Sequence, residues 1–557
     1  MDTSQTPSTE PSADFPVRTT KPSKADNTEP VTGIRFTFLI LSLTLASILV
    51  FLDTSVVSTA VPKITDEFHS LRDVGWYGSA YQLGSAVFGP LSGRILHHFS
   101  LKWCYIAFFT IFELGSALCG AAQSSGMLIV GRAIAGVGAA GISSGAYTVL
   151  SAAVPLEKRP AMLGMLMGIA QLGTICGPLV GGAFTTGYTW RWCFYINLPL
   201  GALVGVPLIL LRIPDQLPKE RAISVLPKLH KHLDLIGFTL LAPAIIQLLL
   251  ALQYGGNQFA WNSSQVIGLF CGAGATFIVW MFWNYHKGDD ALLPFSTIRR
   301  RPVWTSGANY AFMMATVFGS TYFLPLYFQG VKGVNAIMSG VYLLAIVLPQ
   351  LASAVTGGWL VTKIGYLTPF ALVGGTLSCI GSGLFSLFQP NTSTGEWVGY
   401  SIITGLGRGI ALQIPLIAIQ SAVSPDEMSQ AMAFTVWCQY IGPTIFLTLY
   451  NTIFDTSLKS QLREHVPDAN AELIIAAGAT RFRSFVSPQD LPGVLKAFST
   501  SLDHTFYLQA AAGVVAWCAA WGMGWNKIRK SKDAHVDESA VSTPNAQGIK
   551  VEEGSES

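Results

Sequence analysis

Residues 36–59 read FTFLILSLTLASILVFLDTSVVST, and Asp53 is the only charged residue in this run. A hydrocarbon core about 30 Å thick is crossed by about 20 residues of helix, so a run of this length predicts a membrane-spanning segment. Inside lipid the backbone polar groups must bond to one another within the segment, which a helix achieves. Apolar runs of the same kind recur along the chain, and the sequence therefore predicts an all-α, polytopic membrane protein.

The composition leads to the same conclusion. Of the 557 residues, 50% are apolar and only 12% are charged, whereas a soluble domain carries about 25% charged residues. The net charge of +3 arises mainly at the two ends and in short stretches between apolar runs, so it gives no support for nucleic-acid binding. The eight cysteines lie in or beside apolar runs and are interpreted as buried thiols, so we expect no metal and no cofactor.

Counting the apolar runs gives fourteen predicted membrane-spanning helices. The first eight are expected near residues 36–59, 74–96, 102–122, 127–152, 161–184, 192–212, 235–254 and 264–285. The other six are expected near residues 303–328, 334–357, 366–388, 398–421, 430–454 and 504–526.

Lysine and arginine are unevenly distributed over the loops between these spans. The segment 212–234 is rich in both, whereas the loops at 121–126 and 255–262, on the opposite side, have neither. Because cytoplasmic loops carry the excess of basic residues, both termini are expected in the cytoplasm. The two Asn-x-Ser/Thr sequons, Asn262 and Asn391, then lie outside, and we expect both to be glycosylated.

An internal repeat divides the chain into two halves. Gly89-Pro-Leu-Ser-Gly-Arg94 follows the second span and Gly358-Trp-Leu-Val-Thr-Lys363 follows the tenth, both with the pattern Gly-x-Leu-x-x-basic. The repeat predicts two pseudo-symmetric six-helix bundles plus an inserted helical pair. The expected units are a disordered cytoplasmic N-terminal tail (1–34), an N-terminal bundle (35–212), a linker with inserted helices 7 and 8 (213–302), a C-terminal bundle (303–526) with an external loop (455–503), and a disordered cytoplasmic C-terminal tail (527–557).

Four motifs lie in the first half: LDTSVVSTAVP at 52–62, GRAIAGVG at 131–138, GIAQLGTICGPLVGG at 168–182 and WRWCFYINLP at 190–199. In these segments the chain resembles the major facilitator superfamily, and more narrowly its fourteen-span drug:proton antiporter branch, which includes fungal toxin-efflux pumps. The resemblance covers roughly residues 36–526. It implies two halves that rock around a site near the middle of the membrane.

The resemblance also assigns gating and antiport to particular positions. In the motif after the second span, Gly93 stands where the family usually has an Asp, and the usual basic pair is replaced by histidines. In the fifth span, glycines four residues apart share one face and let another helix approach, while a proline there should bend the helix. The gating and antiporter residues are Gly89, Arg94, Gly173, Gly177, Pro178, Gly181 and Gly182.

Ionisable residues inside predicted spans are candidates for proton coupling. Asp53 lies about 27 Å from the inner edge of its span and Arg132 about 8 Å from the outer edge, at 1.5 Å per residue. We therefore expect the two on the same side of the membrane and coupled, and the resemblance associates Arg132 with protons. Alternatively, Asp53 ties helix ends near the outer interface. Glu113 and Arg408, expected near the midplane, are either further coupling residues or structural ties between helices.

Polar and aromatic side chains inside the spans are the candidates for a substrate cavity. An amphipathic organic ligand is held by apolar walls and a few orienting polar groups. The same residue types also form hydrogen bonds between membrane helices, which is the alternative for each candidate. The candidates are Gln82, Tyr81, Gln171, Asn309, Tyr310, Gln350, Gln413 and Gln439.

These features predict secondary active export of small apolar or amphipathic compounds, such as toxins, secondary metabolites or drugs, by proton antiport with alternating access. The dipeptide Gly-Lys is absent, so the chain has no Walker phosphate loop, and it has no HExxH motif, so we do not expect an enzyme. Two alternatives remain: uptake or vacuolar transport of polar solutes such as basic amino acids or siderophores, and a non-transporting membrane sensor of the same fold. We expect a monomer in the plasma membrane, with the vacuolar membrane as the alternative.

Overall fold

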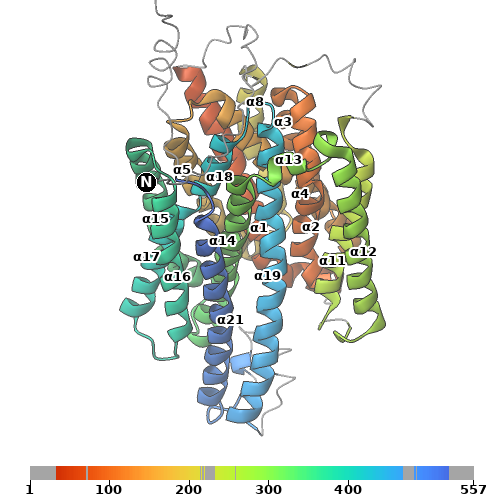
Figure 1. The fold of residues 1–557 in the computed structure, drawn as a ribbon. Helices are drawn as coiled ribbons and strands as arrows, with labels where there is room; N and C mark the ends of the chain where they lie inside the picture. Colours follow the sequence, from red (N-terminus) through yellow and green to blue (C-terminus); the bar gives the residue numbers. More distant parts are fainter. Residues whose placement is uncertain are drawn as a thin grey trace, which may run out of the picture.

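A computed structural model of the chain describes residues 33–69, 73–211, 213, 215, 219, 232–256, 259–467, 474, 482–484 and 486–525. The predicted tails lie outside these residues apart from positions 33 and 34, and so does most of the segment 212–231. The described part is helical, and its long helices run close to parallel (Figure 1).

The first half of the chain forms one group of helices. Within it α3 and α2 both pack on α4, and α1 packs on α6 and α8. The helices are α1 (Ile34–Phe68), α2 (Val74–His98), α3 (Leu101–Gly120), α4 (Ser125–Ala153), α5 (Arg159–Ala170), α6 (Leu172–Gly187), α7 (Trp192–Tyr195) and α8 (Asn197–Leu210).

The second half repeats this pattern of contacts. Here α15 and α16 pack on α17, and α14 packs on α19 and α21. The helices are α13 (Phe295–Ile298), α14 (Arg301–Leu326), α15 (Ala336–Ile364), α16 (Thr368–Leu384), α17 (Thr394–Ala411), α18 (Ile414–Ala422), α19 (Met428–His465) and α21 (Leu491–Ala520), with a π-helical turn at Tyr327–Val331 after α14.

Between the two halves, α11 (Leu235–Tyr254) and α12 (Ser264–Lys287) form a hairpin beside α2 (Figure 1). Asp234 caps α11, and Ser263 caps α12. The α11–α12 turn and the α16–α17 turn lie at the same end of the molecule, which we call the Asn262 end (Figure 1). The opposite end carries the α2–α3 turn, and we call it the His98 end.

Twelve segments of the described chain are long and apolar enough to cross a membrane, two fewer than predicted. The two predicted spans that are not among them fall on α2 and α21. Arg94 and two histidines lower the hydropathy of α2, and His504 and Gln509 lower that of the predicted span on α21. Both helices pack between others, α2 between α4 and α19, and α21 against α14, α16 and α19. Because much of their surface contacts protein, these helices can be less apolar than lipid-facing ones.

The predicted external loop at 455–503 needs correction, because helix occupies much of it. Helix α19 continues to His465 and α21 already begins at Leu491. At 1.5 Å per residue, the 38 residues of α19 span about 57 Å, well beyond the hydrocarbon thickness. Apolar residues beyond the predicted span, including Leu458, Leu462 and Phe498, are buried in one cluster and hold these extensions together.

The predicted fifth span is broken at Gln171 into α5 and α6. Pro178 lies inside α6, one to two turns after the break. A proline lacks the N–H that would bond the carbonyl four residues earlier, here Thr174. The sequence placed the bend at the proline, whereas the helix is interrupted at Gln171, three residues before the carbonyl of Thr174.

The segment 289–293, which follows the inserted hairpin, is held by its backbone. Arg94 Nε donates to the Ala291 carbonyl over 2.9 Å and Nη2 donates to the Asp289 carbonyl over 2.7 Å. The Leu292 N–H donates to Asp234 Oδ2 over 2.7 Å, and Asn284 Nδ2 donates to the Leu293 carbonyl over 2.7 Å. Side chains of α2, α12 and the α11 cap therefore converge on one short segment.

Candidate functional site

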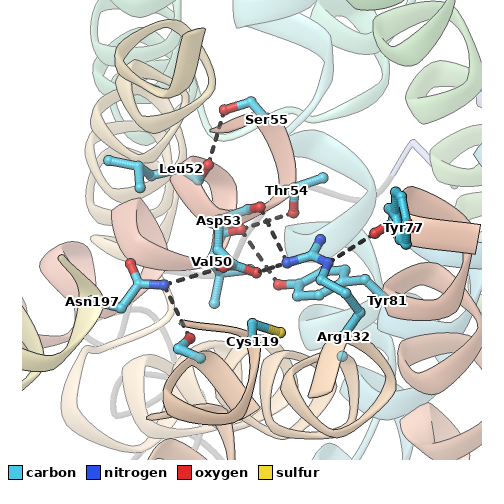
Figure 2. Close-up of polar contacts among 12 residues, drawn as sticks. Val50, Leu52, Asp53, Thr54, Ser55, Tyr77, Tyr81, Cys119, Arg132 and Asn197 are labelled. Carbon is cyan, nitrogen blue, oxygen red and sulfur yellow. Dashed lines mark hydrogen bonds and ion pairs between the residues drawn. The ribbon is translucent and has the colours of Figure 1, made fainter. Parts of the chain in front are cut away.

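A buried ion pair joins α1 to α4 (Figure 2). Arg132 Nη1 lies 2.5 Å from Asp53 Oδ2, and the side chains are 1% and 0% exposed. Arg132 Nε also donates to the Tyr77 carbonyl over 3.0 Å, and the guanidinium lies 4.5 Å from the centroid of the Tyr81 ring. The structure thus brings together the two residues whose depths the sequence matched. A charge pair inside a membrane marks a functional site by default.

Asn197 at the start of α8 extends this pair. Its Nδ2 lies 3.1 Å from Asp53 Oδ1 and 3.0 Å from Ser116 Oγ, so the amide links α1 to α3 (Figure 2). Asn197 is fully buried, and its Oδ1 has no hydrogen-bond partner in the described chain. Sequence reasoning quoted Asn197 within a motif but gave it no role. A polar Asn inside an apolar span could have indicated from the sequence that Asn197 belongs to the site.

Glu113 does not join the ion pair. Its carboxylate lies against Gly201 of α8, and neither oxygen has a hydrogen-bond partner among the described residues. Glu113 is three residues before Ser116 on α3, and Gly201 is four residues after Asn197 on α8. Residues so spaced share a helix face. The carboxylate therefore lies one turn from the Asp53–Asn197–Ser116 chain, toward the His98 end.

Two cavities open between the halves toward the Asn262 end. One, of about 610 Å³, includes Trp261 of the α11–α12 turn and Asn451 of α19 in its walls. The other, of about 580 Å³, lies between α1, α6, α14 and α15. Both have Thr54, Phe318 and Tyr322 in their walls, and Thr54 directly follows Asp53. Cavities of about 300–1,000 Å³ are the usual size for small-molecule sites.

Some predicted cavity residues line these spaces. Gln82 lines the first cavity and Gln171 the second. Gln350 borders two small voids, of about 20 and 10 Å³, and Gln413 borders the smaller one. The larger void shares wall residues, including Gln171 and Thr174, with the second cavity. Several wall residues that the sequence did not single out, including Thr54 and Tyr322, could be found only once the helix faces were known.

The other four predicted cavity residues are not among the walls of these cavities and voids. Tyr81 packs on Arg132. Asn309 donates to the Ala516 carbonyl and so ties α14 to α21. Tyr310 donates to Gln439 Oε1 over 3.3 Å, and Tyr147 of the first half donates to the same oxygen over 3.2 Å. Tyr310 and Gln439 thus belong to a buried hydrogen-bonded contact between the halves.

Arg408 on α17 is buried like Arg132 but has different partners. Its Nη2 donates to the Thr316 carbonyl over 2.7 Å and to Ser320 Oγ over 2.8 Å, and its Nε has no partner. No Asp or Glu of the described residues forms an ion pair with it. The guanidinium borders the void of about 20 Å³ beside the second cavity.

The two halves meet closely toward the His98 end. A methyl group built on Gly93 of α2 would overlap Ala433 of α19, and one built on Gly358 of α15 would lie 3.0 Å from the Pro160 carbonyl carbon. Gly89 is in ordinary contact with Trp437. Arg94 bonds to backbone carbonyls, as described above, and the carboxylates of Asp290, Asp234 and Asp289 favour its charge electrostatically, so it does not depend on the Asp that the family motif usually supplies. The halves are therefore closed at this end and parted at the other.

The glycine stripe of α6 faces α1. Side chains built on Gly173, Gly177 and Gly181 would overlap atoms of Ile48, Ser55 and Thr59 respectively. Gly182 differs, because its position is open and it lines the second cavity. The three-residue stripe lets α6 and α1 pack backbone to backbone, next to the residues that carry the ion pair.

Comparison with known proteins identifies the family. Residues 43–447 match the family described as Major Facilitator Superfamily. The chain belongs to the major facilitator superfamily. This family consists of transporters, not enzymes. The run GISSG at Gly141–Gly145 matches the Gly-x-Ser-x-Gly pattern of hydrolases. It lies inside α4, however, and not at the strand-to-helix turn that the serine nucleophile of such enzymes needs.

Several fungal members of the superfamily are similar to this chain over nearly their whole length. The MFS-type transporter pigP of Monascus ruber is 53% identical, with 90% of this chain and 88% of that protein covered. The MFS-type transporter calB of Penicillium decumbens is 46% identical, with 92% of both covered. The efflux pump mlcE of Penicillium citrinum is 44% identical, with 91% and 93% covered.

Solved structures of superfamily members share the fold. The proton:xylose symporter XylE superposes with a TM-score of 0.58 at 14% identity, covering 90% of this chain and 98% of that one. A bacterial homologue of the lysosomal transporter Spinster gives a TM-score of 0.55 at 16% identity. At these identities the likeness concerns the helical arrangement alone.

Proposed function

We propose that this protein exports small amphipathic organic compounds by exchange for protons, with the two halves alternating between cavities open to opposite sides. The observation that carries the proposal is the Asp53–Arg132 pair, almost fully buried and one residue from the Thr54 wall that both large cavities share. Relatives named as efflux pumps, such as mlcE, support the direction of transport.

The proposed step is a change of charge on Asp53. When ionised, Asp53 is bound by Arg132 and by Asn197, which holds α4 and α8 to α1. Protonation neutralises the carboxylate and weakens these charge-assisted bonds. Once the bond between Asp53 and Arg132 is weakened, α1 can move relative to α4. Because Thr54 is on α1 and lines both cavities, this movement would change the walls around the cargo. Glu113, one turn away, would offer a second site for the proton.

We further propose fourteen spans, with α2 and α21 crossing the membrane as members of the two bundles. This count places both termini in the cytoplasm and the Asn262 end outside, in agreement with the basic residues of the segment 212–234. Asn262 and Asn391 are exposed at that end. In this orientation the cavities are open to the outside, and the protein acts as a monomer in the plasma membrane.

The test is cargo-dependent proton movement in proteoliposomes, reported by a pH dye trapped inside. The probe is 1-pyrenebutanol, a neutral amphipathic compound. Wild-type protein should move protons when the probe is added, and Asp53→Asn should abolish this movement. Glu464→Gln, the same chemical change at an exposed residue of α19, should leave it intact.

The partners left around position 53 allow Asp53→Asn to fold. Arg132 keeps its bond to the Tyr77 carbonyl and its stacking on Tyr81. Unpairing a buried charge costs about 3–5 kcal/mol, so the thermal unfolding of the variant is recorded alongside. Proton movement that persists in folded Asp53→Asn would remove this carboxylate from the mechanism.

A further inference from the structure

We propose that Arg408 is the binding site for an acidic group of the cargo, so that the preferred substrates are amphipathic organic acids. This inference rests on the proposed export function and adds the chemical class of the substrate. It assigns to Arg408 a role different from that of Arg132, although both are buried arginines inside a helical bundle.

The first argument is the missing counter-charge. Arg408 is 2% exposed, and its bonds go to neutral acceptors, the Thr316 carbonyl and the Ser320 hydroxyl. Its Nε is buried without a partner, and no carboxylate in the described chain pairs with it. A buried charge is costly unless it is paired. Because Arg408 Nε has a free N–H and no counter-charge is present among the described residues, the guanidinium can bind an anion that comes from a ligand.

The second argument is that Arg408 lines a void next to the second cavity. The void beside Arg408, of about 20 Å³, shares Gln171, Thr174 and Thr321 with the 580 Å³ cavity. A water-sized group needs about 10–15 Å³, so the void admits one carboxylate oxygen while the rest of a ligand stays in the cavity. Gln350 also borders the void and offers a further polar contact.

The third argument is the chemistry of the cavity itself. Its walls include Phe51, Phe318 and Leu343, together with hydroxyls such as Thr321. Aromatic and aliphatic walls suit an apolar ligand body, and the few polar groups orient it. An arginine fork at one end recognises a carboxylate through paired hydrogen bonds. Together these features define a ligand with an apolar body and one acidic end.

The test uses a matched pair of fluorescent probes, 1-pyrenebutyric acid and 1-pyrenebutanol, with full-length protein in lipid nanodiscs at pH 7.5. Binding is followed by energy transfer from protein tryptophans to pyrene, and empty nanodiscs correct for probe in the lipid. Wild type should bind the acid about tenfold more tightly than the alcohol, which corresponds to about 1.4 kcal/mol. Arg408→Gln should remove this preference while alcohol binding stays unchanged, and Arg408→Lys should keep part of it.

A second variant covers the case in which Arg408→Gln fails to fold. Thr321 lines both the cavity and the void, so Thr321→Leu reduces the space between them and leaves the arginine in place, and it too should remove the acid preference. Arg300→Gln, on the exposed surface at the His98 end, should preserve it. Equal wild-type binding of acid and alcohol, binding of neither, or a preference that survives Arg408→Gln would overturn the proposal.

The two proposals fail in different ways. If wild type moves protons with the alcohol but shows no acid preference, the acidic-group site is wrong and export stands. If neither probe drives proton movement in wild type, the export function itself is contradicted, whatever the binding data show.

Discussion

Gly93 of α2 lies against Ala433 of α19, with the Ser429 carbonyl 3.1 Å from the place where a Cβ would be. The contact belongs to the closed end of the molecule, and it explains why a glycine stands where the family motif usually has an Asp. A carboxylate would have no space here. Arg94 does not depend on one at this position, because it binds backbone carbonyls and lies in the field of Asp290 and Asp234.

We expect Gly93→Asp to separate α2 from α19 at the His98 end and so to shift the protein toward the conformation open to the cytoplasm. The measurement is labelling of Ser429→Cys by a thiol reagent in inside-out vesicles, which should rise several-fold when Gly93→Asp is also present. Gly205→Ala, at an open position on α8, controls for the loss of a helical glycine and should not change the labelling. Unaltered labelling in Gly93→Asp would show that this contact does not hold the end closed.

The glycine stripe gives a second prediction. Gly177→Val places a branched side chain on the Ser55 hydroxyl and should push α6 off α1, which lowers the unfolding temperature and abolishes transport. Overpacking of this kind typically costs about 1–3 kcal/mol. Gly182→Ala, one turn further on and in open space, is the matched control. Equal unfolding temperatures for the two variants would contradict the tight α1–α6 packing.

The orientation can be tested through the two sequons. If the Asn262 end is outside, Asn262→Gln and Asn391→Gln should each remove one glycan, seen as a step in electrophoretic mobility that glycosidase treatment abolishes. Because a folded loop can escape glycosylation, Asn391→Cys in intact cells gives an independent measurement. A membrane-impermeant thiol reagent should label it, and labelling only after the cells are opened would reverse the proposed topology.

The fourth prediction concerns pH at the Asn262 end. Glu67 accepts hydrogen bonds from Arg191 and Trp190, which lower the pKa of its carboxyl below the usual value. A lowered pKa in the folded state means that the contribution of Glu67 to stability is complete above the unfolded pKa of about 4.3 and is lost as the pH falls through the folded value. The same contacts join the end of α1 to the α6–α7 turn.

Thermal unfolding of purified protein should therefore show a loss of stability below about pH 4.3 that is absent in Glu67→Gln. The difference should be small, because half-exposed ion pairs contribute at most about 1 kcal/mol. Glu464→Gln, which changes an exposed carboxylate of α19, should behave as wild type in this range. Identical pH profiles for wild type and Glu67→Gln would contradict the role of this contact.

The positions of most helices could be predicted because long apolar runs leave few alternatives in a membrane. Where the hydropathy fails, as in α2 and α21, the reason is that protein replaces lipid around the helix. The C-terminal end of α19 and the N-terminal end of α21 were not predicted to be helical, because they lie outside the apolar runs. The extension of α19 beyond the membrane is mostly polar, with apolar residues such as Leu458 and Leu462 four positions apart. Leu458, Leu462 and Phe498 are buried in one cluster, which stabilises both extensions.

The sequence predicted how deep in the membrane the residues of the candidate site lie, but not which way their side chains point. Counting residues placed Asp53 and Arg132 at one level, but the link through Asn197 to Ser116 depends on which faces of α3 and α8 turn inward. The unknown directions of the side chains also explain why Tyr81 and Gln82 could not be told apart from the sequence. They are adjacent in the sequence, yet one packs on Arg132 and the other lines a cavity.

The backbone-held segment 289–293 has a consequence for how the protein can vary. Arg94, Asp234 and Asn284 form hydrogen bonds with peptide groups of this segment. These bonds fix the length of the connector, because one inserted or deleted residue would move every peptide group out of register. Ala291, Leu292 and Leu293 are also buried, so their side chains must stay apolar. Homologous pumps should accordingly have the same number of residues in this stretch and keep apolar residues at these three buried positions.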